Sequence, residues 1–121
     1  MGRDQANLSD PAACADAIRT FAPRAVINAA AYTAVDRAEE EEALATTING
    51  DASTAMAQAC AELDIPLIHI STDYVFAGTG DAPWQPDDPT APQNAYGRSK
   101  LAGEIGIRNS GAVHAILRTS W

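Results

Sequence analysis

The sequence is poor in cysteine, in lysine and in long apolar runs. Cys14 and Cys60 stand apart in alanine-rich stretches with no metal-binding spacing, so we expect buried free thiols, no disulfide and no metal site. A net charge of −8 argues against nucleic acid or an anionic membrane as a partner, because both require a basic patch. No apolar run could cross a bilayer, and no basic segment precedes a hydrophobic one as in a secretory leader. We therefore expect a cytoplasmic protein.

The length and the patterning predict one small α/β domain. The 121 residues are 46% apolar and 20% charged, which is typical of a globular chain. Short β-branched runs alternate with segments in which apolar residues recur every three or four positions. Helices are expected from Pro11 to about Ala22, from Glu41 to Glu62, and from Asn94 or Ala95 to Asn109. Strands are expected at 25–28, 65–70 and 112–118, with a Gly/Pro-rich loop at 77–93.

Strands joined by helices of this length predict a parallel βαβαβ half of a doubly wound sheet. The first strand, at 25–28, does not alternate, which is typical of a strand buried on both faces. A complete dinucleotide fold begins with a strand, a Gly-rich turn and a helix, which hold the pyrophosphate. That turn is absent: neither Gly78-Thr79-Gly80 nor the pair Gly103 and Gly106 follows a strand and opens a helix. We therefore expect a partial Rossmann-like domain, residues 1–121, that lacks the first strands.

Three details of the pattern need a physical reason. Asn49-Gly50 interrupts the second helix at a cost of about 1 kcal/mol, so we expect an inward hydrogen bond from Asn49 or close packing of another element. The acidic run at 36–42 is expected to be a solvated face. His69 lies in an apolar strand, which favours a hydrogen-bonded core histidine over a catalytic one.

Tyr96 and Lys100 are the strongest candidates for chemistry. Residues four apart lie on one face of a helix, so phenol and ammonium can point toward one place. A neighbouring cation favours the phenolate, and we therefore expect Lys100 to lower the pKa of Tyr96. Thr72 ends the second strand at the edge where parallel sheets bind ligands, so its hydroxyl could join them at a substrate carbonyl. The alternative is a solvated helix face, but Lys100 is the chain's only lysine.

Small residues follow the first strand. The alanines at 29–31 could simply pack, or they could let a flat ligand approach the backbone at the carboxyl edge of the sheet. The residues alone leave the two readings open.

Four blocks in order resemble the dTDP-4-dehydrorhamnose reductases, a family of extended short-chain dehydrogenases/reductases. They are Asn28 to Asp36 (NAAAYTAVD), Ser71 to Phe76 (STDYVF), Tyr96 to Glu104 (YGRSKLAGE) and Arg118 to Trp121 (RTSW). The resemblance covers nearly the whole chain. It implies reduction of the C4 ketone of dTDP-4-dehydro-L-rhamnose to dTDP-L-rhamnose, with hydride from NADPH or NADH.

The resemblance also implies roles for single residues. Tyr96 would give the proton, Lys100 would hold the nicotinamide ribose, and Thr72 would bond the carbonyl oxygen. The cofactor would be lined by Asn28, Ala29, Ala30 and Ala31, and the sugar approached by Thr33, Asp73, Tyr74 and Trp121. An asparagine in related enzymes supports the lysine through water, a role that would fall to Asn49. The segments that such enzymes have outside this region include the substrate lobe, so we expect the 121 residues alone to be inactive.

Two other functions remain open. A sugar-nucleotide dehydratase or epimerase could use the same scaffold, but dehydratases carry an acidic pair after the threonine, and here Asp73 is followed by Tyr74. A relative in this group regulates methionine adenosyltransferase without catalysis, and the motifs are compatible with such a regulatory subunit. The full-length protein could also be a homodimer.

Overall fold

Three parallel strands and a layer of helices make up the computed structural model, which describes residues 2–120. The elements are α1 (Pro11–Phe21), β1 (Val26–Asn28), α2 (Val35–Ala38), α3 (Glu42–Thr46), α4 (Ala52–Leu63), β2 (Leu67–Thr72), α5 (Ala95–Asn109) and β3 (His114–Thr119). A π-helical turn, Thr47–Asp51, joins α3 to α4, and a 3₁₀ turn, Asp73–Val75, follows β2. These bounds confirm the predicted α/β order.

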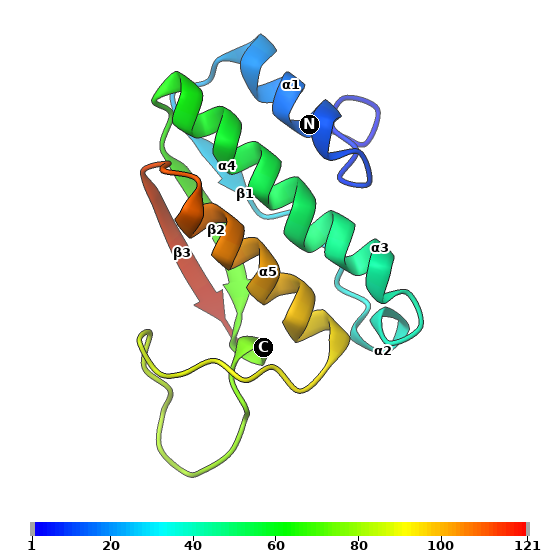
Figure 1. Ribbon diagram of the computed structural model, residues 1–121, viewed down its shortest axis with the longest axis vertical. Helices are drawn as coiled ribbons and strands as arrows, with labels where there is room; N and C mark the ends of the chain where they lie inside the picture. Colours follow the sequence, from blue (N-terminus) through cyan, green and yellow to red (C-terminus); the bar gives the residue numbers. More distant parts are fainter. Residues whose placement is uncertain (1, 121) are drawn as a thin grey trace.

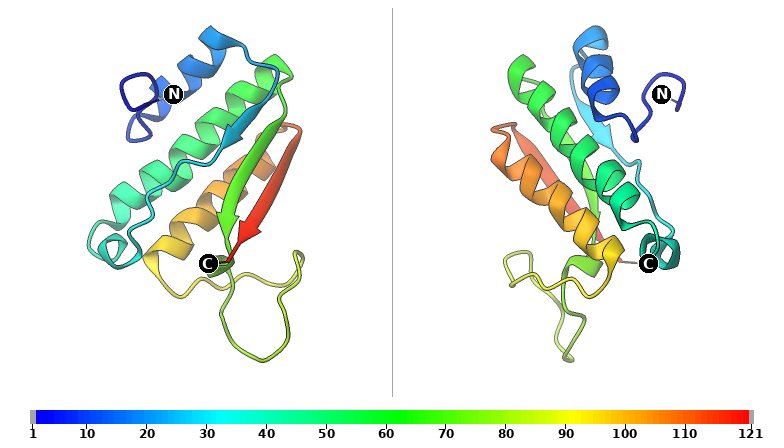
Figure 2. Two further views of the ribbon diagram at one scale, coloured as in Figure 1. Left: turned by 180° about the vertical axis from the view of Figure 1, so that it is seen from behind. Right: turned by 45° about the vertical axis from the view of Figure 1, so that its right-hand side comes forward.

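The sheet has the order β1-β2-β3, and both pairs are parallel. Helices α1, α4 and α5 cover one of its faces, and no helix within residues 2–120 covers the opposite face (Figure 2). Ile27 is 68% exposed and Leu117 51% exposed on that face. The prediction that the strand at 25–28 is buried on both faces is therefore wrong, because all three long helices pack on the same side. The three carboxyl ends lie at one edge, beyond which the 77–93 loop projects (Figure 1).

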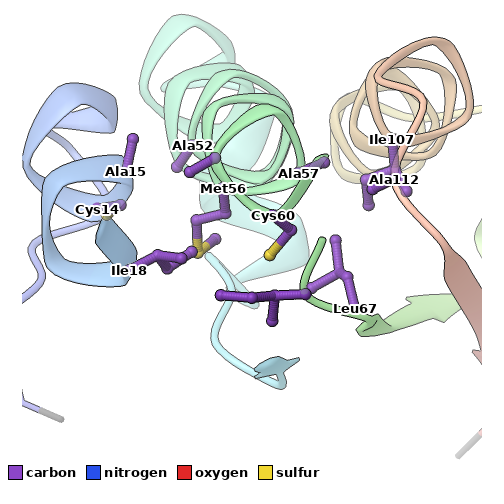
Figure 3. Close-up of a cluster of buried hydrophobic side chains, with 12 residues drawn as sticks. Cys14, Ala15, Ile18, Ala52, Met56, Ala57, Cys60, Leu67, Ile107 and Ala112 are labelled. Carbon is purple, nitrogen blue, oxygen red and sulfur yellow. The ribbon is translucent and has the colours of Figure 1, made fainter. Parts of the chain in front are cut away.

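The main core lies between the helices and the sheet. Side chains from α1, α4 and β2 meet there, among them Ile18, Met56 and Leu67, and Ile107 of α5 closes the cluster (Figure 3). Cys14 and Cys60 are buried free thiols in this core, as predicted.

Helix α1 begins and ends where the sequence predicts. Asp10 accepts a hydrogen bond from the Ala13 amide at 3.2 Å, and Pro11 takes the first helical position, where its missing N–H costs nothing. Ala22 adopts a left-handed conformation (φ 43°), which ends the helix before Pro23.

The long second helix departs from prediction at Asn49-Gly50. The rod runs from Glu42 to Leu63, but the asparagine and the glycine lie in the π-helical turn and are both buried. Both expected reasons are confirmed. The Asn49 side chain bonds inward, and α5 packs close, with a Cβ on Gly50 only 3.2 Å from that of Ala102. A Cβ on Gly103 would collide with the Asn49 carbonyl oxygen, so Gly103 is needed for this approach.

No helix described between residues 2 and 120 is long and apolar enough to cross a membrane. In the same residues, no group of three or more His, Cys, Asp or Glu side chains is arranged to hold a metal ion.

Candidate active site

The end of β2 provides the first functional group. Thr72 is 4% exposed, and its Oγ1 accepts a hydrogen bond from the Tyr74 amide at 3.2 Å, so the hydroxyl caps the 3₁₀ turn that follows. This turn holds Asp73 and Tyr74 beside the strand end. The edge where parallel strands end is where α/β sheets bind ligands.

The first turn of α5 brings Tyr96 to the same edge. Asn94 caps the helix by accepting a hydrogen bond from the Gly97 amide at 2.7 Å. A Cβ on Gly97 would collide with the Tyr74 carbonyl oxygen, so glycine allows this turn to approach the strand end. Tyr96 and Tyr74 then contact edge to face, with ring centroids 5.6 Å apart. The sequence pattern did not predict this aromatic pair.

Tyr96 lines a cavity of about 280 Å³, and most of the predicted substrate-binding residues line it too. The cavity is lined by Thr33, Val35, Thr72, Asp73, Tyr74, Tyr96 and Ser120. Trp121, also predicted to approach the sugar, lies outside the described residues. The structure thus brings together a phenol, a threonine hydroxyl and a carboxylate that are distant in the sequence.

Lys100 lies one turn after Tyr96 but does not line this cavity. It is 2% exposed, and its Nζ donates a hydrogen bond to the Ile70 carbonyl at 2.7 Å. Burial lowers the pKa of Lys100 to about 8, and the charge of Glu104 opposes that shift only in part. The ammonium therefore lies beneath the strand end rather than beside the phenol.

The prediction that Lys100 lowers the pKa of Tyr96 is wrong for this structure. Burial raises the pKa of Tyr96 above its ordinary value, and the Thr72 hydroxyl offsets the rise only partly. Tyr74 and the charge of Asp73 raise it further. Tyr96 and Lys100 do lie one turn apart on α5, as predicted. The sequence did not indicate how deeply the phenol would be buried.

A second cavity, of about 670 Å³, has the predicted cofactor wall on one side. Ala29, Ala30 and Ala31 line it together with Tyr32 and Thr33. Asn28 does not: its Nδ2 is 3.1 Å from Nδ1 of His69 and 3.3 Å from the Ser53 hydroxyl, in the interface between sheet and helices. Leu44 and Ile48 also line the cavity. The side formed by the three alanines has small side chains, so a flat ligand could approach the backbone there.

The amino-terminal segment forms the other side of this second cavity, which the sequence did not predict. The lining residues there are Gly2, Arg3, Ala6, Asn7, Leu8 and Ser9. Residues 1–7 lack periodicity and read as a connector. Arg3 adds a cation to a cavity that otherwise has an uncharged wall, but no local pattern connects it with residues 29–31.

Asn49 connects the wall of the second cavity to the helix that carries Tyr96. Its carboxamide accepts from the Tyr32 amide at 2.8 Å and donates to the Tyr32 carbonyl at 3.0 Å. It also donates to the Ser99 hydroxyl at 2.9 Å, and that hydroxyl donates to the Tyr96 carbonyl at 2.7 Å. The side chain thus bonds the wall loop and α5; its water-mediated support of Lys100 stays a prediction.

A buried ionic network lies behind Thr72. Glu104, fully buried, accepts hydrogen bonds from Ser71 at 2.6 Å and from Arg118 at 2.7 Å, and pairs with Arg108 at 3.0 Å. Burial by itself raises the pKa of Glu104, but the bonds from Arg118 and Ser71 and both arginine charges outweigh it and leave this pKa below its usual value. The network fixes the residue that precedes Thr72.

Arg118 extends this network to the long loop. Its Nη1 donates to the Pro86 carbonyl at 3.0 Å, and its guanidinium lies 4.8 Å from the centre of the Phe76 ring. Phe76 in turn stacks on Trp84, with centroids 4.8 Å apart. Arg118 and Phe76 therefore hold the middle of the loop, at Trp84 and Pro86, against the end of the sheet, while a role in covering substrate stays a prediction.

His69 is a core residue, as the sequence predicts. It is fully buried, Asn28 bonds its Nδ1, and Nε2 has no hydrogen-bond partner among residues 2–120. Burial, and then the nearby charge of Lys100, lower the pKa of His69 to about 4, while Glu104 acts in the opposite direction. The imidazole is therefore neutral at physiological pH.

Comparison with known proteins identifies the family. The family model described as "RmlD substrate binding domain" matches residues 1–121, the whole chain. The chain belongs to this RmlD family. It is 47% identical over 115 residues to a dTDP-4-dehydrorhamnose reductase of Salmonella typhimurium, an alignment that covers 95% of this chain and 38% of the relative. A reductase of the same name from Sinorhizobium fredii is 46% identical over 121 residues, which cover 100% of this chain and 41% of the relative.

The fold of this RmlD family chain matches part of a solved reductase structure. The Bacillus anthracis dTDP-4-dehydrorhamnose reductase in complex with NADP superposes with a TM-score of 0.95 at 34% identity, over 100% of this chain and 43% of that one. The chain thus spans about 40% of the length of the curated relatives it matches. The three-stranded parallel sheet corresponds to part of a Rossmann-like fold.

Proposed function

We propose that the protein containing these residues reduces the C4 ketone of dTDP-4-dehydro-L-rhamnose to dTDP-L-rhamnose. The observation that carries the proposal is the shared cavity of Tyr96, Thr72 and Asp73, with Lys100 buried one turn away. Similarity to named reductases along the whole chain supports it. Residues 1–121 would form part of the NAD(P)-binding domain, and a cytoplasmic location and a homodimer stay predictions.

Tyr96 is the proton donor in this proposal. Because burial raises its pKa, the phenol keeps its proton at neutral pH, as an acid must before the reaction. Thr72, whose hydroxyl lies at the end of β2, would bond the carbonyl oxygen and orient it toward that phenol. As negative charge develops on this oxygen, the proton moves from the Tyr96 oxygen to it.

The remaining residues bind and orient. NADPH or NADH would supply the hydride from the second cavity, where Ala29, Ala30 and Ala31 leave room for a flat ring. Asn28 would contribute through its backbone, since its side chain is bonded in the interior. Lys100 lines neither cavity, but its Nζ donates only one hydrogen bond within the described residues, to the Ile70 carbonyl, and has two further hydrogens with which it would hold the ribose. With a pKa of about 8 it is mostly charged at pH 7.

The sugar would lie in the smaller cavity. Thr33, Asp73 and Tyr74 line it and can bind hydroxyl groups, and Trp121 is predicted to join them. A dehydratase would need a second carboxylate after Asp73, where this chain has Tyr74. Incubation with dTDP-glucose separates the two activities, because only a dehydratase would form the keto sugar.

The test is an assay for reduction of dTDP-4-dehydro-L-rhamnose by the native-length protein, in which oxidation of NADPH or NADH is measured. Changing Tyr96→Phe removes the proton and should lower turnover by at least about a hundredfold, with coenzyme affinity unchanged. Retained turnover in this variant would remove Tyr96 as the acid. No reduction by the wild type, together with recovery of a protein partner, would favour the regulatory-subunit alternative.

A further inference from the structure

Four consecutive glutamates, residues 39–42, lie where α2 ends and α3 begins. The sequence predicts a solvated charge run, and indeed Glu39 and Glu40 are exposed while Glu41 and Glu42 are half-buried. Three of the four side chains nevertheless form specific bonds, which the prediction did not include. Glu41 is bonded to the Tyr32 hydroxyl at 2.5 Å, and Glu42 forms an ion pair with Arg98 at 2.7 Å. Glu39 reaches furthest: its Oε1 accepts a hydrogen bond from the Ala95 amide at 2.8 Å, 56 residues along the chain.

The Ala95 amide is the first in α5, and first-turn amides have no partner within their own helix. The Asn94 side chain accepts a hydrogen bond from the Gly97 amide, and the Glu39 side chain accepts one from the Ala95 amide. A carboxylate at this end of a helix also interacts favourably with the positive end of the helix dipole. Tyr96 is the next residue, so whatever holds this turn sets the position of the phenol.

Apolar packing joins the same corner to α5. Ala38, Ala45 and Ala95 are fully buried against one another, and the rings of Tyr32 and Tyr96 pack on this trio. Ala38, which precedes the acceptor Glu39, and Ala95, which carries the donor amide, thus pack in one cluster. Bond and packing together determine where the turn lies.

We propose that Glu39 is a positioning residue for Tyr96, an inference that rests on the proposed function. Glu39 lines neither the cavity of Tyr96 nor that of the alanine wall, so it acts through the helix. Without it the Ala95 amide is left to water, the first turn loosens, and the phenol moves relative to Thr72. Lys100, one turn further, keeps its bond to Ile70. Turnover then falls while coenzyme binding is preserved.

The experiment uses variants of the native-length protein that separate the effect of side-chain length at position 39 from the effect of its charge. Glu39→Ala removes the acceptor and Glu39→Asp keeps the charge but is one methylene too short. Glu39→Gln keeps an oxygen at the right distance. In the described residues the Glu40 side chain forms no hydrogen bond or ion pair, so Glu40→Ala is the matched control.

We expect kcat to fall about tenfold in the Ala and Asp variants, since small displacements of a reacting group are costly, with coenzyme affinity unchanged. The Gln variant and the Glu40 control should stay close to wild type. Hydrogen exchange of the amides at 95–98 should accelerate in the Ala and Asp variants alone. This second readout needs no activity.

Three results would overturn the inference. They are equal kcat and equal exchange in Glu39→Ala and Glu40→Ala, a Gln variant as impaired as the Ala variant, or an Asp variant as active as wild type. A wild type that reduces no keto sugar would instead remove the proposed function, and the exchange rates would still show whether Glu39 holds the turn. If Glu39→Ala fails to fold, the Asp and Gln variants decide.

Discussion

The buried imidazole of His69 makes stability depend on pH in a way that can be calculated. Its pKa is about 4 in the folded protein and about 6.5 in an unfolded chain. Between these values the unfolded state binds more protons, so the stability is complete above pH 6.5 and is lost as the pH falls toward 4. Integration from pH 7.5 to 5.0 gives a loss of about 2 kcal/mol from this one residue.

Urea unfolding at pH 7.5 and pH 5.0 measures this loss. His69→Gln keeps a partner for Asn28 but cannot titrate, so its loss over this interval should be about 2 kcal/mol smaller than in the wild type. The chain's other histidine, His114, is exposed at the start of β3, and His114→Gln is the matched control for replacing a histidine by glutamine.

The pH difference within each variant is the quantity to compare, because the substitution itself could change stability at every pH. Equal losses in the wild type and His69→Gln would refute the reasoning. They would mean that the imidazole is protonated in the folded state at pH 5, for example because Nε2, which bonds no group in the described part of the chain, reaches water.

Three further perturbations test the site and its support. The kcat/KM of the native-length enzyme should fall above pH 8 as Lys100 loses its charge, and in Lys100→Arg any residual activity should show this fall at higher pH; an unchanged profile would contradict this. Glu104→Ala leaves buried arginine charge unpaired and should cost about 3–5 kcal/mol in urea unfolding, whereas Glu62→Ala, which removes an exposed pair, should change little. Gly103→Ala places a methyl group against the Asn49 carbonyl and should cost about 1–3 kcal/mol; an unaltered melting temperature would show that α5 can shift.

The sequence predicts the elements of this fold well because their signals are local. Pro11 and Ala22 bound α1, the β-branched runs become strands, and Gly111 follows α5 with a positive φ of 82°. The exposure of Ile27 could not be predicted in this way. A run of apolar residues indicates a strand but does not show whether helices pack on one face of it or on both.

In the candidate site, too, the features with local sequence signals were predictable and those that depend on long-range packing were not. The spacing of Tyr96 and Lys100 and the position of Thr72 follow from helix and strand geometry. The raised pKa of Tyr96 depends on how deeply the phenol is buried, which spacing does not specify. The bond from Glu39 to the Ala95 amide joins positions 56 residues apart, so the acidic run by itself gave no sign of it.

The π-helical turn has a consequence for the helical rod from Glu42 to Leu63. Ahead of the turn, Ala45 packs against α5; beyond it, Met56 and Cys60 face α1 and the sheet. Each residue of an α-helix turns the chain by about 100°, so the extra residue in the wider turn sets the rotational phase between these two faces. Deleting one residue from 47–51 would give a more regular helix whose two halves could no longer fit both partners at once.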